Sequence, residues 1–179
     1  LEKVDEATAA QLDADRVVYT DPAVSLHILT NTVDGPASDP LVRAAISKAI
    51  DRDAIAAALG QGTLPATGIL APSIPGMTEP TEPYSFDLDE AQALMAQSGS
   101  PDGLSIGYLY DVGDREADVI AQILVTQLAQ IGIDLKLEPT DAATQSSRLA
   151  DGDFELADGA AGAISPTIFD PIGYMMAVS

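Results

Sequence analysis

The stretch LSIGYLYDVGDREADVIAQILVTQLAQIGIDLKLEPTDAATQSSRLADGDFELAD, residues 104–158, decides the fold. Apolar side chains alternate over residues 104–110 and again over 133–137, and this two-residue period is typical of strands with one buried face. Between these strands, apolar residues recur at helical spacing after Asp114, a favourable N-cap, and the run closes at Gly132. The first part of the stretch therefore predicts a strand, a helix and a strand.

A second helix and a third strand complete this stretch. Thr140 or Asp141 can cap a helix that ends at Gly152, and Phe154 and Leu156 begin the next strand. Strands separated by helices in this way pair in parallel through right-handed crossovers, which predicts an α/β fold. In open sheets of this kind, ligands sit outside the carboxyl ends of the strands. Three loops are expected at that edge: residues 110–114, 138–141 and 158–166.

The residues upstream of this stretch predict three further helices. Asp39 and Pro40 start the first as its N-cap and first helical residue, and Asp51 caps the second over residues 52–59. The third runs from about residue 88 to 98 and ends at Gly99. Extended or irregular segments are expected at residues 16–20, 24–31 and 61–86.

The composition excludes several classes of function. The 179 residues carry 8 lysines and arginines against 28 aspartates and glutamates, a net charge of −20, so the chain would repel the phosphates of nucleic acids and of anionic membrane surfaces. Cysteine is absent, which leaves no disulfide or thiolate metal site within these residues. Because 46% of the residues are hydrophobic, we expect a folded core under an acidic surface rather than a disordered acidic segment.

The residues give little sign of catalytic or metal-binding chemistry. His27, the single histidine, lies in an expected strand beside Ser25, where side chains point alongside one another rather than converge as a nucleophile and its base must. The acids of residues 151–155 alternate as in a calcium loop, but Leu156 replaces the required glycine. We therefore expect no catalytic residue, no metal and no cofactor.

The expected ligand edge carries one arginine and several aspartates. Arg115 begins a helix at the end of a strand, and an arginine beside free helix-start amides suits a carboxylate group of a ligand. The same arginine can instead pair within its own turn with Asp111, Asp114 or Asp118. Asp111 and Asp158 lie at the carboxyl ends of two of the expected strands, so a hydrolase that uses these two carboxylates for general acid–base chemistry is an alternative function.

Several segments resemble one family. In chain order they are DPLVRAAISKAIDR (39–52), YSFDLDEAQALM (84–95), GSPDG (99–103), QLAQIGI (127–133) and GDFELA (152–157). In this order and spacing they are similar to the extracytoplasmic solute-binding proteins of peptide, oligopeptide and nickel ABC importers, solute-binding family 5, over about residues 17–174. The resemblance implies a lobe of the type II periplasmic-binding-protein-like fold, with a mixed, mostly parallel sheet flanked by helices.

The resemblance also implies an organisation and a role. Residues 1–16 would lead in from a first lobe, and residues 17–179 would form a carboxyl-terminal lobe that is incomplete at its end. Such a protein is not an enzyme: it captures a peptide or peptide-like solute between two lobes and delivers it to the membrane permease of an ABC importer. We accordingly expect an extracytoplasmic location, in the periplasm or lipid-anchored at the outer face of the cytoplasmic membrane.

Ligand-binding residues are implied by the resemblance in two places. Tyr110, Asp111 and Arg115 fall where some dipeptide binders grip a carboxylate with an arginine. The other four occupy the segment after the last strand: Ala161, Gly162, Ile164 and Ser165.

This second segment departs from the family pattern. Peptide-binding members carry an aromatic residue and, three residues later, an aspartate that pairs with the amino group of the peptide, whereas Ala161 and Ile164 occupy these positions here. A buried ammonium without that partner would cost roughly 3–5 kcal/mol. A solute without a free amine, such as a sugar, a modified peptide or a metal complex, is therefore an alternative ligand. A peptide chaperone or a signalling receptor built on the same lobe is an alternative to import.

Overall fold

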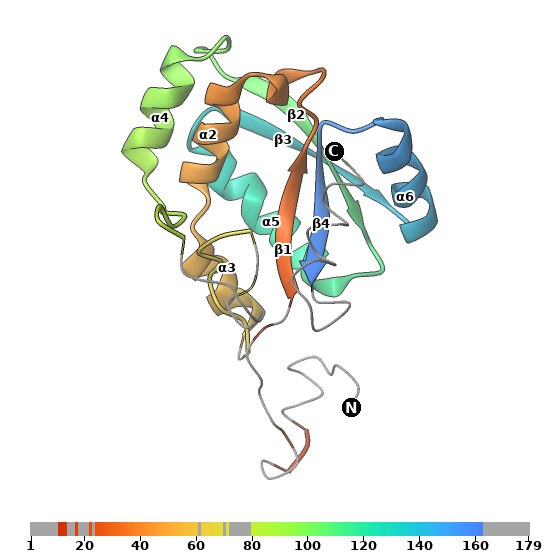
Figure 1. The fold of residues 1–179 in the computed structure, drawn as a ribbon. Coiled ribbons are helices and arrows are strands. Elements are labelled where there is room, and N and C mark those ends of the chain that lie inside the picture. Colours follow the sequence, from red (N-terminus) through yellow and green to blue (C-terminus); the bar gives the residue numbers. More distant parts are fainter. Residues whose placement is uncertain are drawn as a thin grey trace.

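The computed structural model describes residues 11–13, 17, 22, 24–60, 62–69, 71 and 80–162, and of residues 160–162 the backbone alone. In chain order its elements are β1 (Val24–Thr30), the short 3-10 helix η2 (Pro36–Ser38), α2 (Pro40–Ala49), α3 (Arg52–Leu59), α4 (Leu88–Gln97), β2 (Leu104–Asp111), α5 (Arg115–Ala129), β3 (Ile133–Thr140), α6 (Ala142–Asp151) and β4 (Leu156–Gly162). Figure 1 shows their arrangement. Both helices and all three strands predicted over residues 104–158 are present.

The strands form one mixed sheet in the order β1-β4-β2-β3 (Figure 1). β2 lies parallel to both β3 and β4, whereas β1 runs antiparallel to β4. The expectation of a mixed, mostly parallel sheet flanked by helices is thus confirmed. Parallel strands joined through helices bring their carboxyl ends to one edge, which is where the sequence places the ligand loops.

One face of the sheet carries the hydrophobic core. The side chains of Ile106 and Tyr108 on β2 and of Ile133 and Leu135 on β3 point to this face, and none is more than 5% exposed. The helices α2, α4 and α5 cover it with Val42, Ile46, Met95, Leu124 and Leu128. This face accounts for the apolar stripes that the sequence shows at helical spacing.

The opposite face of the sheet receives α6. Arg148 of α6 pairs with Glu138 of β3 at 2.8 Å, and Glu138 alternates with the core residue Leu137 along the strand. Successive side chains of a strand point to opposite faces, so α6 lies across from α5. The sheet is therefore covered on both sides near the carboxyl ends of β2 and β3.

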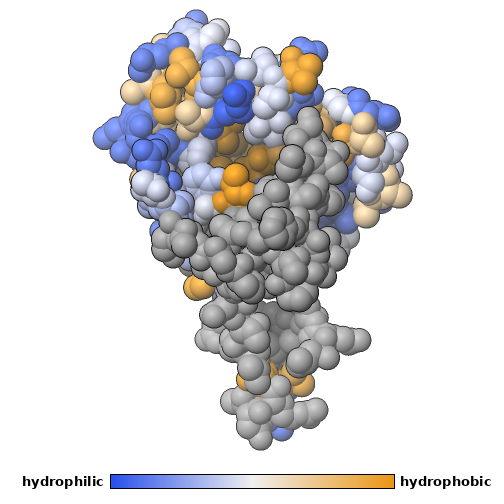
Figure 2. Space-filling model, viewed as in Figure 1, coloured by the Kyte–Doolittle hydropathy of each residue, from blue (hydrophilic) through white to orange (hydrophobic). Residues whose placement is uncertain are grey.

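An aspartate caps each of the α-helices α2 to α6 in the described part of the chain. The capping residues, whose carboxylates accept backbone N–H groups of the first turn, are Asp39, Asp51, Asp87, Asp114 and Asp141. The predicted caps are confirmed, and the choice between Thr140 and Asp141 falls on Asp141. Part of the negative charge therefore caps the amino-terminal ends of helices, where the helix dipole and free N–H groups stabilise carboxylates. Hydrophilic residues also cover the surface around α4 in Figure 2.

The structure corrects the end of the last strand. Residues 158–162 were expected in a loop, but they continue β4 as far as Gly162. The reason is a partner strand: β1 pairs with β4 along its whole length, from Thr30 opposite Leu156 to Val24 opposite Gly162. A run of glycine and alanine has weak strand propensity of its own, so the sequence pattern alone does not reveal this extension.

Gly159 allows a side chain of β1 to pack closely against the backbone of β4. A Cβ atom at this position would lie 2.9 Å from the side chain of Leu29, so the leucine lies directly over the glycine.

Of the segment predicted to be extended at residues 16–20, only residue 17 is among the described residues. None of the described helices is long and apolar enough to cross a membrane.

Candidate ligand-binding site

The carboxyl edge of the sheet is built from turns held by aspartates. After β2, Asp111 Oδ1 accepts the backbone N–H of Gly113 at 2.8 Å, and Asp114 Oδ1 accepts that of Glu116 at 2.8 Å. After β3, Asp141 Oδ1 accepts the N–H groups of the first turn of α6, and these bonds lower the pKa of its carboxyl. Two of the three predicted loops therefore lie together at this edge, in a strongly acidic setting.

Tyr110 points into the core and away from the solvent at this edge. Its side chain is only 4% exposed, and its hydroxyl donates to Asp118 Oδ1 of α5 at 3.1 Å. Its ring stacks with that of Tyr108, with centroids 6.0 Å apart. Burial and the bond to Asp118 raise the pKa of Tyr110, and burial also raises the pKa of Tyr108. Tyr110 thus anchors α5 to β2 directly below the loop that starts at Asp111.

Asp111 and Arg115 lie on one turn between β2 and α5. Asp111 is half-buried at the last position of β2, and Arg115 is the exposed first residue of α5. The structure therefore places these two predicted residues on either end of one turn at the carboxyl edge. This placement follows from the cap at Asp114, which starts α5 immediately after the turn.

The other predicted ligand residues follow β4. Ala161 and Gly162 form the end of β4, where their backbones pair with Ser25 and Val24 of β1. Ile164 and Ser165 lie outside the described residues. Within the described residues, the predicted set thus divides between the turn after β2 and the end of β4.

Asp158 is the residue of this edge whose environment the sequence did not reveal. It lies within β4, half-buried. Its carboxyl accepts a hydrogen bond from the side-chain amide of Gln145 on α6 and lies near the backbone N–H of Asp111. Burial raises the pKa of Asp158, although these two contacts oppose the rise, and the nearby carboxylates of Asp114 and Asp111 add to it. The only sequence signal is an acid inside an otherwise small, apolar strand.

His27 lies in β1 opposite Gly159, as an ordinary strand residue. Its Nε2 atom is buried without a hydrogen-bond partner among the described residues, and burial lowers the pKa of the imidazole. Ser25, two residues away, is also buried. Among the residues that the structure describes, no third group orients this pair as a nucleophile and base would require.

The described ranges contain no cluster of three or more histidine, cysteine, aspartate or glutamate side chains able to hold a metal ion.

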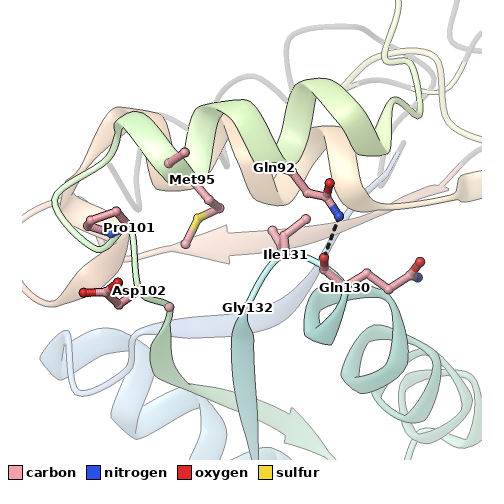
Figure 3. Close-up of a pocket in the computed structure, with 9 residues that line it drawn as sticks. Gln92, Met95, Pro101, Asp102, Gln130, Ile131 and Gly132 are labelled. Carbon is pink, nitrogen blue, oxygen red and sulfur yellow. Dashed lines mark hydrogen bonds between the residues drawn. The ribbon is translucent and has the colours of Figure 1, made fainter.

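A shallow cavity of about 270 Å³ lies at the opposite, amino-terminal end of β2 and β3 (Figure 3). It is bounded by α4, by the turn at Pro101 and by the turn that precedes β3, and Gln92 Nε2 donates to the backbone carbonyl of Gln130 across it at 3.0 Å. This cavity is separate from the carboxyl edge.

Comparison with known proteins identifies the family. Residues 2–177 match the family described as bacterial extracellular solute-binding proteins, family 5 Middle. A curated relative, the glutathione-binding protein GsiB of Salmonella choleraesuis, is 32% identical over 124 residues, which are 69% of this chain and 24% of the relative. The chain therefore spans about a quarter of the length of this relative.

Solved structures agree with this match. NikA from Brucella suis, in complex with Fe(III)-EDTA, has a TM-score of 0.73 and 26% identity, covering 80% of this chain and 32% of NikA. DppA from Helicobacter pylori, in complex with the peptide STSA, has a TM-score of 0.68 and 26% identity, covering 78% of this chain and 29% of DppA. The chain belongs to the bacterial extracellular solute-binding proteins of family 5.

Proposed function

We propose that this chain is the ligand-enclosing, carboxyl-terminal lobe of the substrate-binding component of an ABC importer. The observation that carries the proposal is the family match over residues 2–177 on a sheet whose strand ends meet at one edge. Residues 17–179 would form the lobe and residues 1–16 would lead into it. Closure of two lobes about a hinge would trap the solute, and a membrane permease would recognise the closed form.

The charges at the carboxyl edge suit a peptide or peptide-like solute. Asp111, Asp114 and Asp158 lie close enough for their charges to interact, so an anionic group beside them would be repelled. A cationic or hydrogen-bond-donating group is favoured there, whereas Arg115 on the same turn suits a carboxylate. A zwitterion with separated charges satisfies both, and glutathione and a peptide are the ligands named for GsiB and DppA.

A metal complex is the second candidate ligand. NikA from Brucella suis, with a similar fold and 26% identity, was solved with Fe(III)-EDTA. A chelate needs no partner for a free amine, which agrees with Ile164 in place of the aspartate of peptide-binding members. A sugar or a modified peptide would meet the same condition.

We propose binding without turnover. A carboxylate hydrolase needs one acid with a raised pKa, and Asp158 has this property. However, its carboxyl is already engaged by Gln145 and by the backbone of Asp111, which leaves it poorly placed to transfer a proton to a substrate. The family match supports capture, and the extracellular family supports a location outside the cytoplasmic membrane.

Calorimetric titration of the full-length protein with four probes would test this function. The probes are glutathione, the peptide Ser-Thr-Ser-Ala, stachyose and Fe(III)-EDTA, each recovered afterwards and analysed by mass spectrometry. We expect submicromolar binding of at least one peptide probe and its recovery intact. Binding of Fe(III)-EDTA or stachyose alone would select the non-peptide alternative, and recovery of a cleaved probe would establish the hydrolase.

The role in import is tested in cells. A strain that lacks the gene should lose uptake of the probe that the protein binds, and a plasmid copy should restore it. Normal uptake together with a lost chemotactic or transcriptional response to that probe would assign a signalling role instead.

A further inference from the structure

The neighbouring strands of the sheet differ in how many residue positions they pair. β1 and β4 pair at seven positions, and β2 and β3 pair at eight. β2 and β4, in the middle of the sheet, pair at only two: Tyr108 opposite Leu156, and Leu109 opposite Ala157. We call this junction the β2–β4 seam and define it as residues 107–111 of β2 with residues 155–158, which are the start of β4 and the residue before it.

The backbone N–H groups of β2 show where the seam lacks a ladder. Leu104, the first residue of β2, donates to the carbonyl of Gly132 just before β3 at 3.1 Å, and Val112, just after β2, donates to that of Thr140 at the end of β3 at 2.9 Å. Successive N–H groups of a central strand point to opposite sides, so the odd-numbered residues of β2 direct theirs toward β4. Gly107 and Asp111 are the odd-numbered residues on either side of the two-position ladder.

A side-chain carboxylate lies at each of these N–H groups. Glu155, immediately before β4, accepts the N–H of Gly107 through Oε2 at 2.6 Å. The carboxyl of Asp158, the first residue of β4 beyond the ladder, lies near the backbone N–H of Asp111, which lowers the pKa of this carboxyl. The seam is thus a two-position ladder with an acid on either side, and Glu155 takes the place of a backbone carbonyl as the acceptor of the Gly107 N–H.

The two strands beyond the seam form one unit. Besides the seven-position register, Asn31 at the end of β1 donates its backbone N–H to the carbonyl of Glu155 at 2.9 Å and its side-chain amide to that of Phe154 at 3.0 Å. β1 and β4 are therefore more firmly joined to each other than β4 is to β2.

Charged and titratable groups face both acids of the seam. Glu155 shares the space above Gly107 with Glu138 of β3, and Arg148 of α6 pairs with Glu138 at 2.8 Å. Around Asp158 lie Tyr108 and Asp111 of β2 and the helix cap Asp114, with the neutral amide of Gln145 contributed by α6.

We propose that Glu155 and Asp158 are positioning residues, which make the β2–β4 seam a joint that sets the end of β4 relative to the turn after β2. The end of β4 carries Ala161 and Gly162, and the turn carries Asp111 and Arg115, so the seam fixes the distance between the two halves of the candidate site. The expected effect on ligand affinity rests on the proposed function. The existence of the joint is independent of that function, because the joint is defined by contacts between β2 and β4 within the sheet.

Amide hydrogen exchange in the full-length protein tests the joint. Glu155→Ala should speed exchange at Gly107 by about tenfold or more, because this amide loses its acceptor. Asp158→Ala should speed exchange at Asp111 by several-fold, because this amide loses the carboxylate beside it. Glu155→Gln and Asp158→Asn keep an acceptor oxygen and should restore most of the protection. Glu82→Gln and Asp151→Asn, at exposed positions outside the seam, remove the same charge and should change neither amide.

Unchanged exchange at both amides in the alanine variants would overturn the proposal, as would amide variants that exchange as fast as the alanine ones. If an alanine variant does not fold, the wild-type protein supplies the second measurement by NMR. The amide proton of Asp111 should then shift with the titration of Asp158, and that of Gly107 with Glu155. Amide shifts that do not follow these carboxyls would equally overturn it.

Ligand affinity separates the joint from the proposed function. With glutathione as the probe, the Asp158→Ala protein should bind several-fold more weakly than wild type and Asp158→Asn nearly as well. If the wild-type protein binds none of the four probes, the proposed function fails, whereas the exchange result still decides the joint. If glutathione binds equally to all variants while exchange changes, the seam does not position the site, and that part of the inference is wrong.

Discussion

Asp39 joins two segments that lie 60 residues apart in the sequence. Its Oδ1 atom accepts the N–H of Leu41 at 2.8 Å and caps α2, while its Oδ2 atom accepts the N–H of Gly99 at 2.8 Å. These two bonds lower the pKa of Asp39. One carboxylate thus fixes both the start of α2 and the turn after α4, the two helices that pack together on the core face.

Replacement of Asp39 should therefore destabilise the lobe in a pH-dependent way. Because the folded protein lowers the pKa of Asp39, its ionised form stabilises the fold above pH 3.8, and this stabilisation is lost as the pH falls toward the lower folded pKa. Asp39→Asn should reduce the free energy of unfolding at pH 7 and by less at pH 3, measured by urea denaturation. Asp102→Asn, in the same turn region as Gly99, is the matched control. An equal deficit at both pH values would contradict this assignment.

A buried glutamine attaches α5 to the start of α3. Gln127 is 7% exposed, its Oε1 accepts the N–H of Asp51 at 3.2 Å, and its Nε2 donates to the carbonyl of Asp51 at 3.3 Å. Gln127→Leu should lower the free energy of unfolding by about 1–3 kcal/mol, because two partly buried backbone groups lose their partner. Thermal unfolding should show no such loss for Gln122→Leu on the exposed side of α5. A Gln127→Leu protein as stable as wild type would show that water replaces the amide.

The sequence predicts the elements of this lobe well, because their signals are local. Two-residue alternation finds β2 and β3, and an aspartate before an apolar stripe finds the starts of α2 and α5. The end of β4 is different. Its residues lack strand propensity, and the partner that makes them a strand, β1, lies more than 120 residues earlier in the chain.

The candidate site is predicted in outline only. The carboxyl ends of parallel strands meet at one edge of a sheet, which predicts Asp111 and Arg115 at that edge, and the structure has them at the end of β2 and the start of α5. Tyr110 shares the core face with Ile106 and Tyr108, as alternation along β2 already implies. The contacts of Asp158 with Gln145 and the backbone of Asp111 could not be predicted, because they depend on where β4 leaves β2.

Asp158 should give the protein an unusual response to acid. Burial raises its folded pKa above 3.8, so the folded state binds the proton more tightly than the unfolded state does. As the pH falls from neutral through the raised pKa toward 3.8, this residue should therefore add stability rather than remove it. Asp158→Asn should abolish that increment, seen as the difference between the wild-type and variant unfolding midpoints from pH 7 to pH 4.

The matched control for this titration is Asp151→Asn, an exposed aspartate at the end of α6. Its difference from wild type should vary less with pH than that of Asp158→Asn. A wild-type protein that loses stability relative to Asp158→Asn on acidification would mean that the contacts of Asp158 with Gln145 and with the backbone of Asp111 outweigh burial.

Gly107 is the glycine of β2, and a side chain at this position should destabilise the fold. A Cβ atom there would collide with a carboxylate oxygen of Glu138 and lie 3.3 Å from Oε2 of Glu155, the acceptor of its own N–H group. Gly107→Ala should lower the free energy of unfolding by about 1 kcal/mol, at the low end for overpacking, because the displaced atoms are the ends of two flexible carboxylate side chains.

Gly99→Ala is the control for this substitution, since its Cβ atom would meet only Asp39 Oδ2, at an ordinary 3.5 Å. Adding Glu138→Ala to Gly107→Ala should recover part of the loss, and a double-mutant cycle with urea denaturation measures the coupling. Additive effects in that cycle would show that Glu138 moves aside freely. The space above Gly107 would then be no constraint on the β2–β4 seam.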